Sequence, residues 1–128
     1  MASIFTKIIN GEIPSIKVHE DGKTLAIMDI NPIQEGQILV IPKTEVSFVW
    51  DLNPKDYQAL MDTVRRAGIS IRKAFPNKTH VGVMIEGLEV VDHAHVKVFP
   101  FSNAVEYHAE ARPADQSDLI KLATRLTF

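Results

Sequence analysis

The sequence predicts an α+β fold, a five-stranded antiparallel sheet with one long central helix and a C-terminal helix. Two observations carry this prediction. Short apolar or alternating segments are joined by turn residues, as in antiparallel sheets, and two longer segments repeat apolar residues at helical spacing. A length of 128 residues fits one domain, so we expect a single domain over residues 1–128. We also expect the helices to cover one face of the sheet.

Five segments have the character of strands. The first two flank Asp21-Gly22, a dipeptide that favours a hairpin because both residues tolerate positive φ. The third is apolar on both faces, which is typical of a central strand. The fourth and fifth alternate apolar and polar residues. The expected strands are residues 16–20, 24–29, 37–42, 80–86 and 93–100.

Residues 54–75 form the clearest helix. Asn53 can cap it, and Pro54 suits the first helical position because the missing N–H costs nothing there. Apolar residues then recur at helical spacing up to Phe75. A second helix is expected over residues 115–126. A short helical turn is expected over residues 3–10.

Composition and charge exclude several classes of function. Fourteen Lys and Arg face sixteen Asp and Glu, so the chain lacks the basic excess of a nucleic-acid-binding surface. It has no cysteine, which excludes thiolate metal sites and cysteine nucleophiles. No apolar run approaches the ~20 residues of a membrane span, and the start lacks a secretory signal. We therefore expect a cytoplasmic protein that binds no specific nucleic acid and no membrane.

The residues of greatest chemical interest are His93, His95 and Lys97. Side chains alternate between the two faces of a strand, so these three are expected in a row on one exposed face. The apolar residues that alternate with them, which should face the core, are Ala94, Val96 and Val98. Two imidazoles and an ammonium side by side are costly unless an anion lies nearby or the histidines are neutral.

Three interpretations of this row are open. It can be a solvated polar face without function. It can bind a metal through both histidines, although Lys97 would repel a cation. The third ligand would then come from His80, Glu86, Asp92 or His108. It can bind a phosphate, with Lys97 neutralising phosphate oxygens and a neutral His95 attacking phosphorus.

With its neighbouring segments, this row resembles the histidine triad family of nucleotide hydrolases and transferases. The signature strand of that family is His-x-His-x-His with apolar residues between, and residues 91–100 match it except at Lys97. The resemblance extends to the opening segment, residues 4–14, and to Ile27-Met28-Asp29-Ile30-Asn31-Pro32. It also includes residues 36–43. The order and spacing of these blocks are similar over residues 3 to 100.

The resemblance implies an α+β fold, a homodimer and roles for particular residues. His95 resembles the nucleophile that takes up the α-phosphate, and His93 resembles the histidine that supports it. Asp29 resembles the carboxylate that binds both ribose hydroxyls, although it can equally be a turn residue. The apolar slot for the base would be formed by Ile4, Phe5, Ile8, Ile27 and Ile30. These five residues can equally be ordinary core.

Two departures from the family pattern bear on activity. Lys97 stands where the third histidine is expected, and Gln37 stands where many members carry a further histidine in the third strand, just after the small turn. An ammonium with a usual pKa of ~10.4 is a poor proton donor to a leaving group. We still expect Lys97 to be a catalytic residue and Gln37 to be a nucleotide-binding residue.

The function that the resemblance implies is hydrolysis at the α-phosphate of a purine nucleotide derivative, through a nucleotidyl-histidine intermediate. The substrate would be a nucleoside phosphoramidate, an adenylate or a dinucleoside polyphosphate. No metal or other cofactor is expected. Two alternatives stay open: a nucleotide-binding module with little or no catalysis, and a nucleotidyl transferase that uses phosphate as acceptor.

Overall fold

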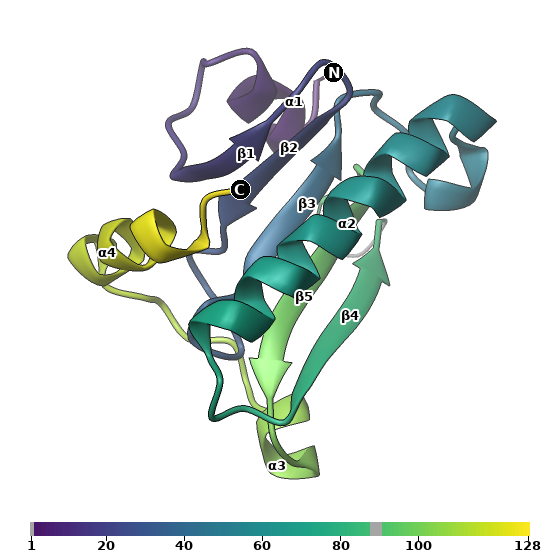
Figure 1. Ribbon diagram of the computed structural model, residues 1–128. Helices are drawn as coiled ribbons and strands as arrows, with labels where there is room; N and C mark the ends of the chain where they lie inside the picture. Colours follow the sequence, from purple (N-terminus) through teal and green to yellow (C-terminus); the bar gives the residue numbers. More distant parts are fainter. Residues whose placement is uncertain (1, 88–90) are drawn as a thin grey trace.

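A computed structural model describes residues 2–87 and 91–128 and confirms the expected α+β fold (Figure 1). Its sheet has five antiparallel strands in the order β1-β2-β3-β5-β4. The strands are β1 (Lys17–Glu20), β2 (Thr24–Met28), β3 (Ile38–Pro42), β4 (His80–Glu86) and β5 (His95–Phe101). The last of these begins two residues later than the sequence predicts, so His93 precedes the strand. No helix in the described part of the chain is both long and apolar enough to cross a membrane.

The β1–β2 hairpin forms at the expected place, but a side chain rather than glycine geometry organises its turn. Asp21 Oδ1 accepts hydrogen bonds from the backbone N–H groups of Lys23 and Thr24, each at 2.8 Å. Gly22 does not adopt positive φ, which among the described glycines is confined to Gly11 and Gly36. The dipeptide therefore marks the hairpin correctly, while the Asp side chain supplies its hydrogen bonds.

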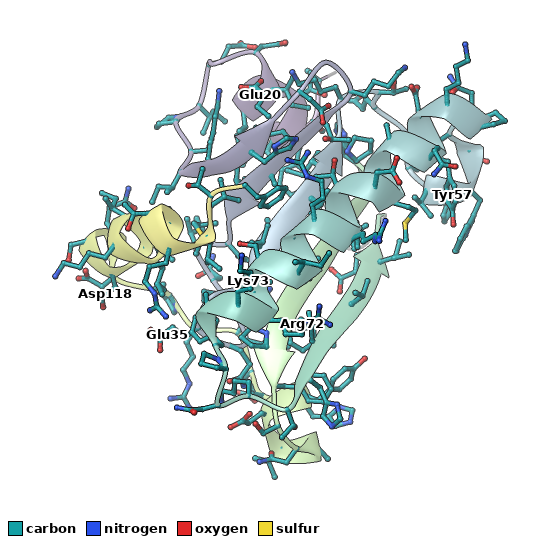
Figure 2. All side chains as sticks on the ribbon, in the orientation of Figure 1. Glu20, Glu35, Tyr57, Arg72, Lys73 and Asp118 are labelled. Atoms are coloured by element: carbon teal, nitrogen blue, oxygen red, sulfur yellow. The ribbon has the colours of Figure 1, made fainter. Side chains whose placement is uncertain are left out.

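The helices are α1 (Ile4–Ile9), α2 (Pro54–Ala74), the short α3 (Ala104–Tyr107) and α4 (Gln116–Leu126), with a 3₁₀ turn, η1 (Val49–Asp51). Asn53 caps α2 by accepting the N–H of Asp56 at 2.9 Å, and Pro54 occupies the first turn. Basic residues near the end of α2, including Arg72 and Lys73, point outward and complement the negative end of the helix dipole (Figure 2).

The two faces of the sheet carry separate apolar clusters. On one face, α2 crosses the strands and α4 lies beside β1, over a core that includes Met28, Val40 and Val96. On the other face, Phe5 of α1 packs with a second set of buried residues, Leu25, Ile27, Leu39 and Ile41. The expectation that helices cover one face is therefore wrong. The residues of β2 and β3 are buried on both sides because α1 folds back over the second face.

Gly36 is a position where only glycine fits. Its φ is +91°, and a Cβ built there would lie 2.6 Å from Cζ of Phe75. We expect Gly36→Ala to lower the free energy of unfolding by about 1–3 kcal/mol, through backbone strain and displacement of the Phe75 ring. Urea denaturation measures this change. Gly22→Ala is the matched control, because a Cβ at Gly22 has no neighbour within 4 Å. Equal stability of the two variants would contradict the prediction.

Candidate active site

A cavity of about 610 Å³ opens on the α1 face of the sheet, within the size range of small-ligand sites. Its wall is mainly apolar. All five residues of the expected base slot line it: Ile4, Phe5, Ile8, Ile27 and Ile30. Ile4 and Ile30 are 49% and 62% exposed, which is unlike ordinary core and suits contact with a ligand. The cavity has further apolar lining residues beyond these five, including Ile13, Ile16, Leu39 and Val91.

His95 lines this cavity with its ring held by the backbone. Its Nδ1 lies 2.8 Å from the carbonyl oxygen of His93. Because a carbonyl only accepts, Nδ1 must carry the hydrogen, and in the neutral ring Nε2 then keeps its lone pair. The edge of the Phe5 ring packs against the imidazole, with centroids 4.9 Å apart. The local backbone thus fixes the neutral tautomer in which Nε2 keeps its lone pair.

His93 is fully buried and has both ring nitrogens occupied. Its Nε2 donates to the carbonyl of Pro42 at 2.9 Å, so the neutral ring accepts at Nδ1 from the Ser3 hydroxyl at 2.7 Å. The expectation of an exposed histidine is wrong here, because the segment before β5 turns inward against β3 and α1. His93 does not line the cavity; it fixes the carbonyl that binds His95.

The start of α1 is tied to His93 through a small polar network. Ser3 caps α1 by accepting the N–H of Thr6 at 3.0 Å. Glu45 accepts from the Thr6 hydroxyl at 2.6 Å and from the Ser3 N–H at 2.8 Å. These hydrogen bonds lower the pKa of Glu45 to about 2. The network holds Phe5 and His93 in a fixed relation, and so supports the geometry of His95.

Burial of His93 predicts a pH dependence of stability. Burial lowers the pKa of His93 below its usual 6.5, so the unfolded chain takes up this proton more readily than the folded one. The contribution of this group to the free energy of unfolding is complete above about pH 6.5. As the pH is lowered past this value, the contribution decreases by at most about 1.4 kcal/mol per pH unit. Urea denaturation of wild type and His93→Gln at pH 7.5 and 5.5 tests this. Wild type should lose more stability than the variant; equal losses would contradict the assignment.

Lys97 faces the cavity but is not a free cation. Its Nζ lies 2.9 Å from Oε2 of Glu86, and the same oxygen lies 3.5 Å from Nε2 of His95. Glu86 reaches this place because the β4–β5 register sets it opposite His95. The expectation that Lys97 alone supplies charge to a phosphate is therefore incomplete, since a carboxylate already balances it.

Asp29 follows β2 directly and lines the cavity, and the residue as a whole is only 8% exposed. Oδ1 accepts from the N–H of Asn31 at 2.9 Å, and Oδ2 accepts from Nε2 of Gln37 at 2.7 Å. Each oxygen has a second lone pair, so the group can still accept two hydroxyl hydrogen bonds. Gln37, expected among the nucleotide-binding residues, is buried and does not line the cavity. It positions Asp29 instead.

Metal binding through the two histidines does not fit this arrangement. Both nitrogens of His93 are occupied by Ser3 and Pro42, and Nδ1 of His95 is bound to a backbone carbonyl. Across residues 2–87 and 91–128, no group of three or more His, Cys, Asp or Glu is placed to bind a metal ion. The solvated-face interpretation also fails, because His93 and His95 are 0% and 6% exposed.

Comparison with known proteins identifies the family. The model of the HIT domain matches residues 10–104. The chain belongs to the HIT family. It is 34% identical over 127 residues to an adenosine 5'-monophosphoramidase of Candida albicans, covering 93% of this chain and 83% of that protein. It is 31% identical over 100 residues to an adenylylsulfatase of Arabidopsis thaliana, covering 76% of this chain and 51% of that protein.

A solved structure of similar fold supports the same assignment. This HIT chain superposes on a Hit-like protein of Bartonella henselae with a TM-score of 0.85 and 28% identity, over 98% of this chain and 94% of that one. The shared architecture accounts for the agreement between the fold expected from sequence and the fold found.

Proposed function

We propose that this HIT chain hydrolyses a purine nucleoside 5'-phosphoramidate or related adenylate at the α-phosphate, with His95 as nucleophile. The observation that carries the proposal is the tautomer of His95, with Nδ1 bound to the His93 carbonyl and Nε2 left with its lone pair in a ligand-sized cavity. The names of the Candida albicans and Arabidopsis thaliana relatives support this class of substrate.

The cavity offers a place for each part of such a substrate. The base would lie among the apolar side chains near Phe5 and Ile27, and the ribose hydroxyls would bind the free lone pairs of Asp29. The phosphate would then meet Nε2 of His95, with the Lys97 ammonium close enough to the same cavity to offset charge on its oxygens.

The proposed reaction has two displacements at phosphorus. In the first, Nε2 of His95 forms a bond to phosphorus, the P–N bond to the amine breaks, and the leaving nitrogen takes a proton from solvent or from Lys97. The His93 carbonyl stabilises the cationic ring that results, through the Nδ1–H bond. In the second, water forms the new P–O bond, the bond from phosphorus to Nε2 breaks, and the water proton returns to solvent or to Lys97.

Trapping tests this proposal. The protein is mixed with an adenosine 5'-phosphoramidate labelled at phosphorus, quenched in alkali within milliseconds to seconds, digested and mapped. We expect the label on the peptide that contains His95, and none on the same peptide from His95→Ala. Turnover without any labelled protein at any quench time would overturn the covalent mechanism.

The Glu86–Lys97 pair favours a second candidate, a nucleotide-binding module with little catalysis, because a balanced Lys97 contributes less to a transition state. Calorimetry with adenosine 5'-monophosphate, run beside a turnover assay, separates the two. Tight binding with turnover at background would support the module. Repeating the turnover assay with added phosphate separates a hydrolase from a transferase, because only a transferase forms a nucleoside diphosphate.

We also propose that the chain forms a homodimer through strand β4. This strand is at the edge of the sheet, and its apolar residues Val83 and Ile85 are 43% and 39% exposed. An exposed apolar edge favours pairing with a second copy. Light scattering after size-exclusion chromatography should give twice the monomer mass for wild type and a smaller mass for Val83→Lys. The control Ile120→Lys, on the exposed side of α4, should keep the dimer. A monomeric wild type would contradict the proposal.

A further inference from the structure

The carboxylate of Glu86 lies where the proposed chemistry has no use for it. Its Oε2 is 3.5 Å from the nucleophilic Nε2 of His95 and 2.9 Å from Nζ of Lys97. A substrate phosphate beside His95 would bring negative oxygens close to this negative carboxylate. Like charges at such distances repel by several kcal/mol unless a cation intervenes. The position of Glu86 therefore needs an explanation in terms of the substrate.

The other charges that line the cavity do not remove the repulsion between Glu86 and a substrate phosphate. Among its described lining residues, Asp29 and Glu86 are carboxylates, Lys97 is the ammonium, and His95 is the imidazole, which must be neutral to attack phosphorus. Two negative charges and one positive charge leave a net charge of −1 before any ligand enters. The cavity is thus poorly suited to a substrate with several negative charges near the reacting phosphorus.

An exchange of ion-pair partners resolves this conflict. When the α-phosphate approaches His95, its oxygens compete with Glu86 for the Lys97 ammonium. Glu86 then loses its partner, and a partly buried carboxylate without a partner is costly. A positive charge on the leaving group would pair with Glu86, so that both charges of the original pair stay compensated. An anionic leaving group would instead meet an unpaired carboxylate.

We propose that Glu86 is a specificity-determining residue that selects substrates by the charge of the leaving group. A leaving group that carries an ammonium is favoured, and one that carries a carboxylate, sulfate or further phosphate is disfavoured. This inference rests on the proposed function, because it assigns the substrate class of the same site. It predicts that Glu86 affects the choice between substrates, rather than the rate of every substrate alike.

Two matched probes test the inference. Both are phosphoramidates of adenosine 5'-monophosphate; in one the phosphorus is joined to 1,3-diaminopropane, which ends in an ammonium, and in the other to β-alanine, which ends in a carboxylate. Their kcat/KM values are compared for wild type, Glu86→Gln and the control Glu35→Gln. Glu35 is exposed, lies in the loop beside the end of α2 and does not line the cavity (Figure 2).

We expect wild type and Glu35→Gln to prefer the ammonium probe at least tenfold, and Glu86→Gln to lose about tenfold of that preference. Tenfold corresponds to about 1.4 kcal/mol. Added salt should reduce the preference of wild type, as for any partly exposed charge. If Glu86 only holds Lys97 in place, the substitution changes both probes by the same factor. An unchanged ratio, or a wild type that prefers the carboxylate probe, overturns the inference.

Binding measurements separate this inference from the proposed function. The dissociation constants of both probes are measured in the His95→Ala background, with and without Glu86→Gln, where no nucleophile consumes the ligand. Turnover by wild type with an unchanged probe ratio overturns the inference and leaves the hydrolase. Binding with the expected ratio, but no turnover by wild type, overturns the hydrolase and leaves the role of Glu86. Absence of binding overturns both.

Discussion

Replacing His95 by alanine is expected to lower kcat/KM for an adenosine 5'-phosphoramidate by about 1,000-fold or more. The reason is that Nε2 of His95 forms the bond to phosphorus, and no other imidazole of the described residues lines the cavity. Binding should change far less, because the base and ribose contacts do not involve this ring. Steady-state kinetics give the loss of kcat/KM, and calorimetry with adenosine 5'-monophosphate gives the change in affinity.

Two controls make the His95 result specific. His80→Ala removes an exposed histidine at the start of β4, outside the cavity, and should keep wild-type kinetics. Thermal unfolding of His95→Ala should remain cooperative, because the His93 carbonyl loses one hydrogen bond but the Phe5 ring stays packed with its other neighbours. A variant that retains turnover within tenfold of wild type would show that His95 is not the nucleophile.

Replacing Asp29 by alanine is expected to weaken the binding of adenosine 5'-monophosphate by about 10- to 100-fold. The carboxylate would accept hydrogen bonds from both ribose hydroxyls, and a hydrogen bond to a charged group contributes about 1.5–3 kcal/mol net of exchange with water. In the variant, water that replaces the carboxylate restores part of this loss. The substitution also leaves Nε2 of Gln37 without its acceptor. Calorimetry on the folded variant measures the loss.

The sugar itself supplies the control for Asp29. The 2',3'-dideoxy form of adenosine 5'-monophosphate lacks both hydroxyls, so wild type and Asp29→Ala should bind it with similar affinity. The difference between the two ligands isolates the hydroxyl contacts from any general disturbance of the loop. Equal weakening for both ligands would show that Asp29 supports the fold of this loop without contacting the ribose.

The regular parts of the fold follow closely from local patterns in the sequence. Asn53 and Pro54 mark the start of α2 within one residue, because capping and the missing N–H of proline are local effects. Ala94, Val96 and Val98 lie in the core as the alternation predicts. The hairpin at Asp21 is equally local.

Features that depend on contacts between distant segments were not predictable in the same way. Alternation placed His93 on an exposed face, but the strand begins at His95, and the segment before it turns toward Pro42 and Ser3. Gln37 stands where many family members carry a further histidine, but its amide donates to Asp29 and does not line the cavity. Neither contact has a signal at short sequence spacing.

Glu86 is the residue of the site whose position near His95 the sequence did not predict. The sequence suggests it only as a third metal ligand, because its approach to His95 and Lys97 depends on the exact register of β4 against β5. A carboxylate at the end of β4 can face a histidine at the start of β5 when the two strands pair antiparallel. The sequence alone does not show that these two strands are neighbours.

A crystal structure with bound adenosine 5'-monophosphate tests the central claim most directly. We expect the base among the apolar residues near Phe5, both ribose hydroxyls hydrogen-bonded to the carboxylate of Asp29, and the phosphorus facing Nε2 of His95 at van der Waals distance. A phosphate bound away from His95, or a nucleotide outside this cavity, would contradict the account.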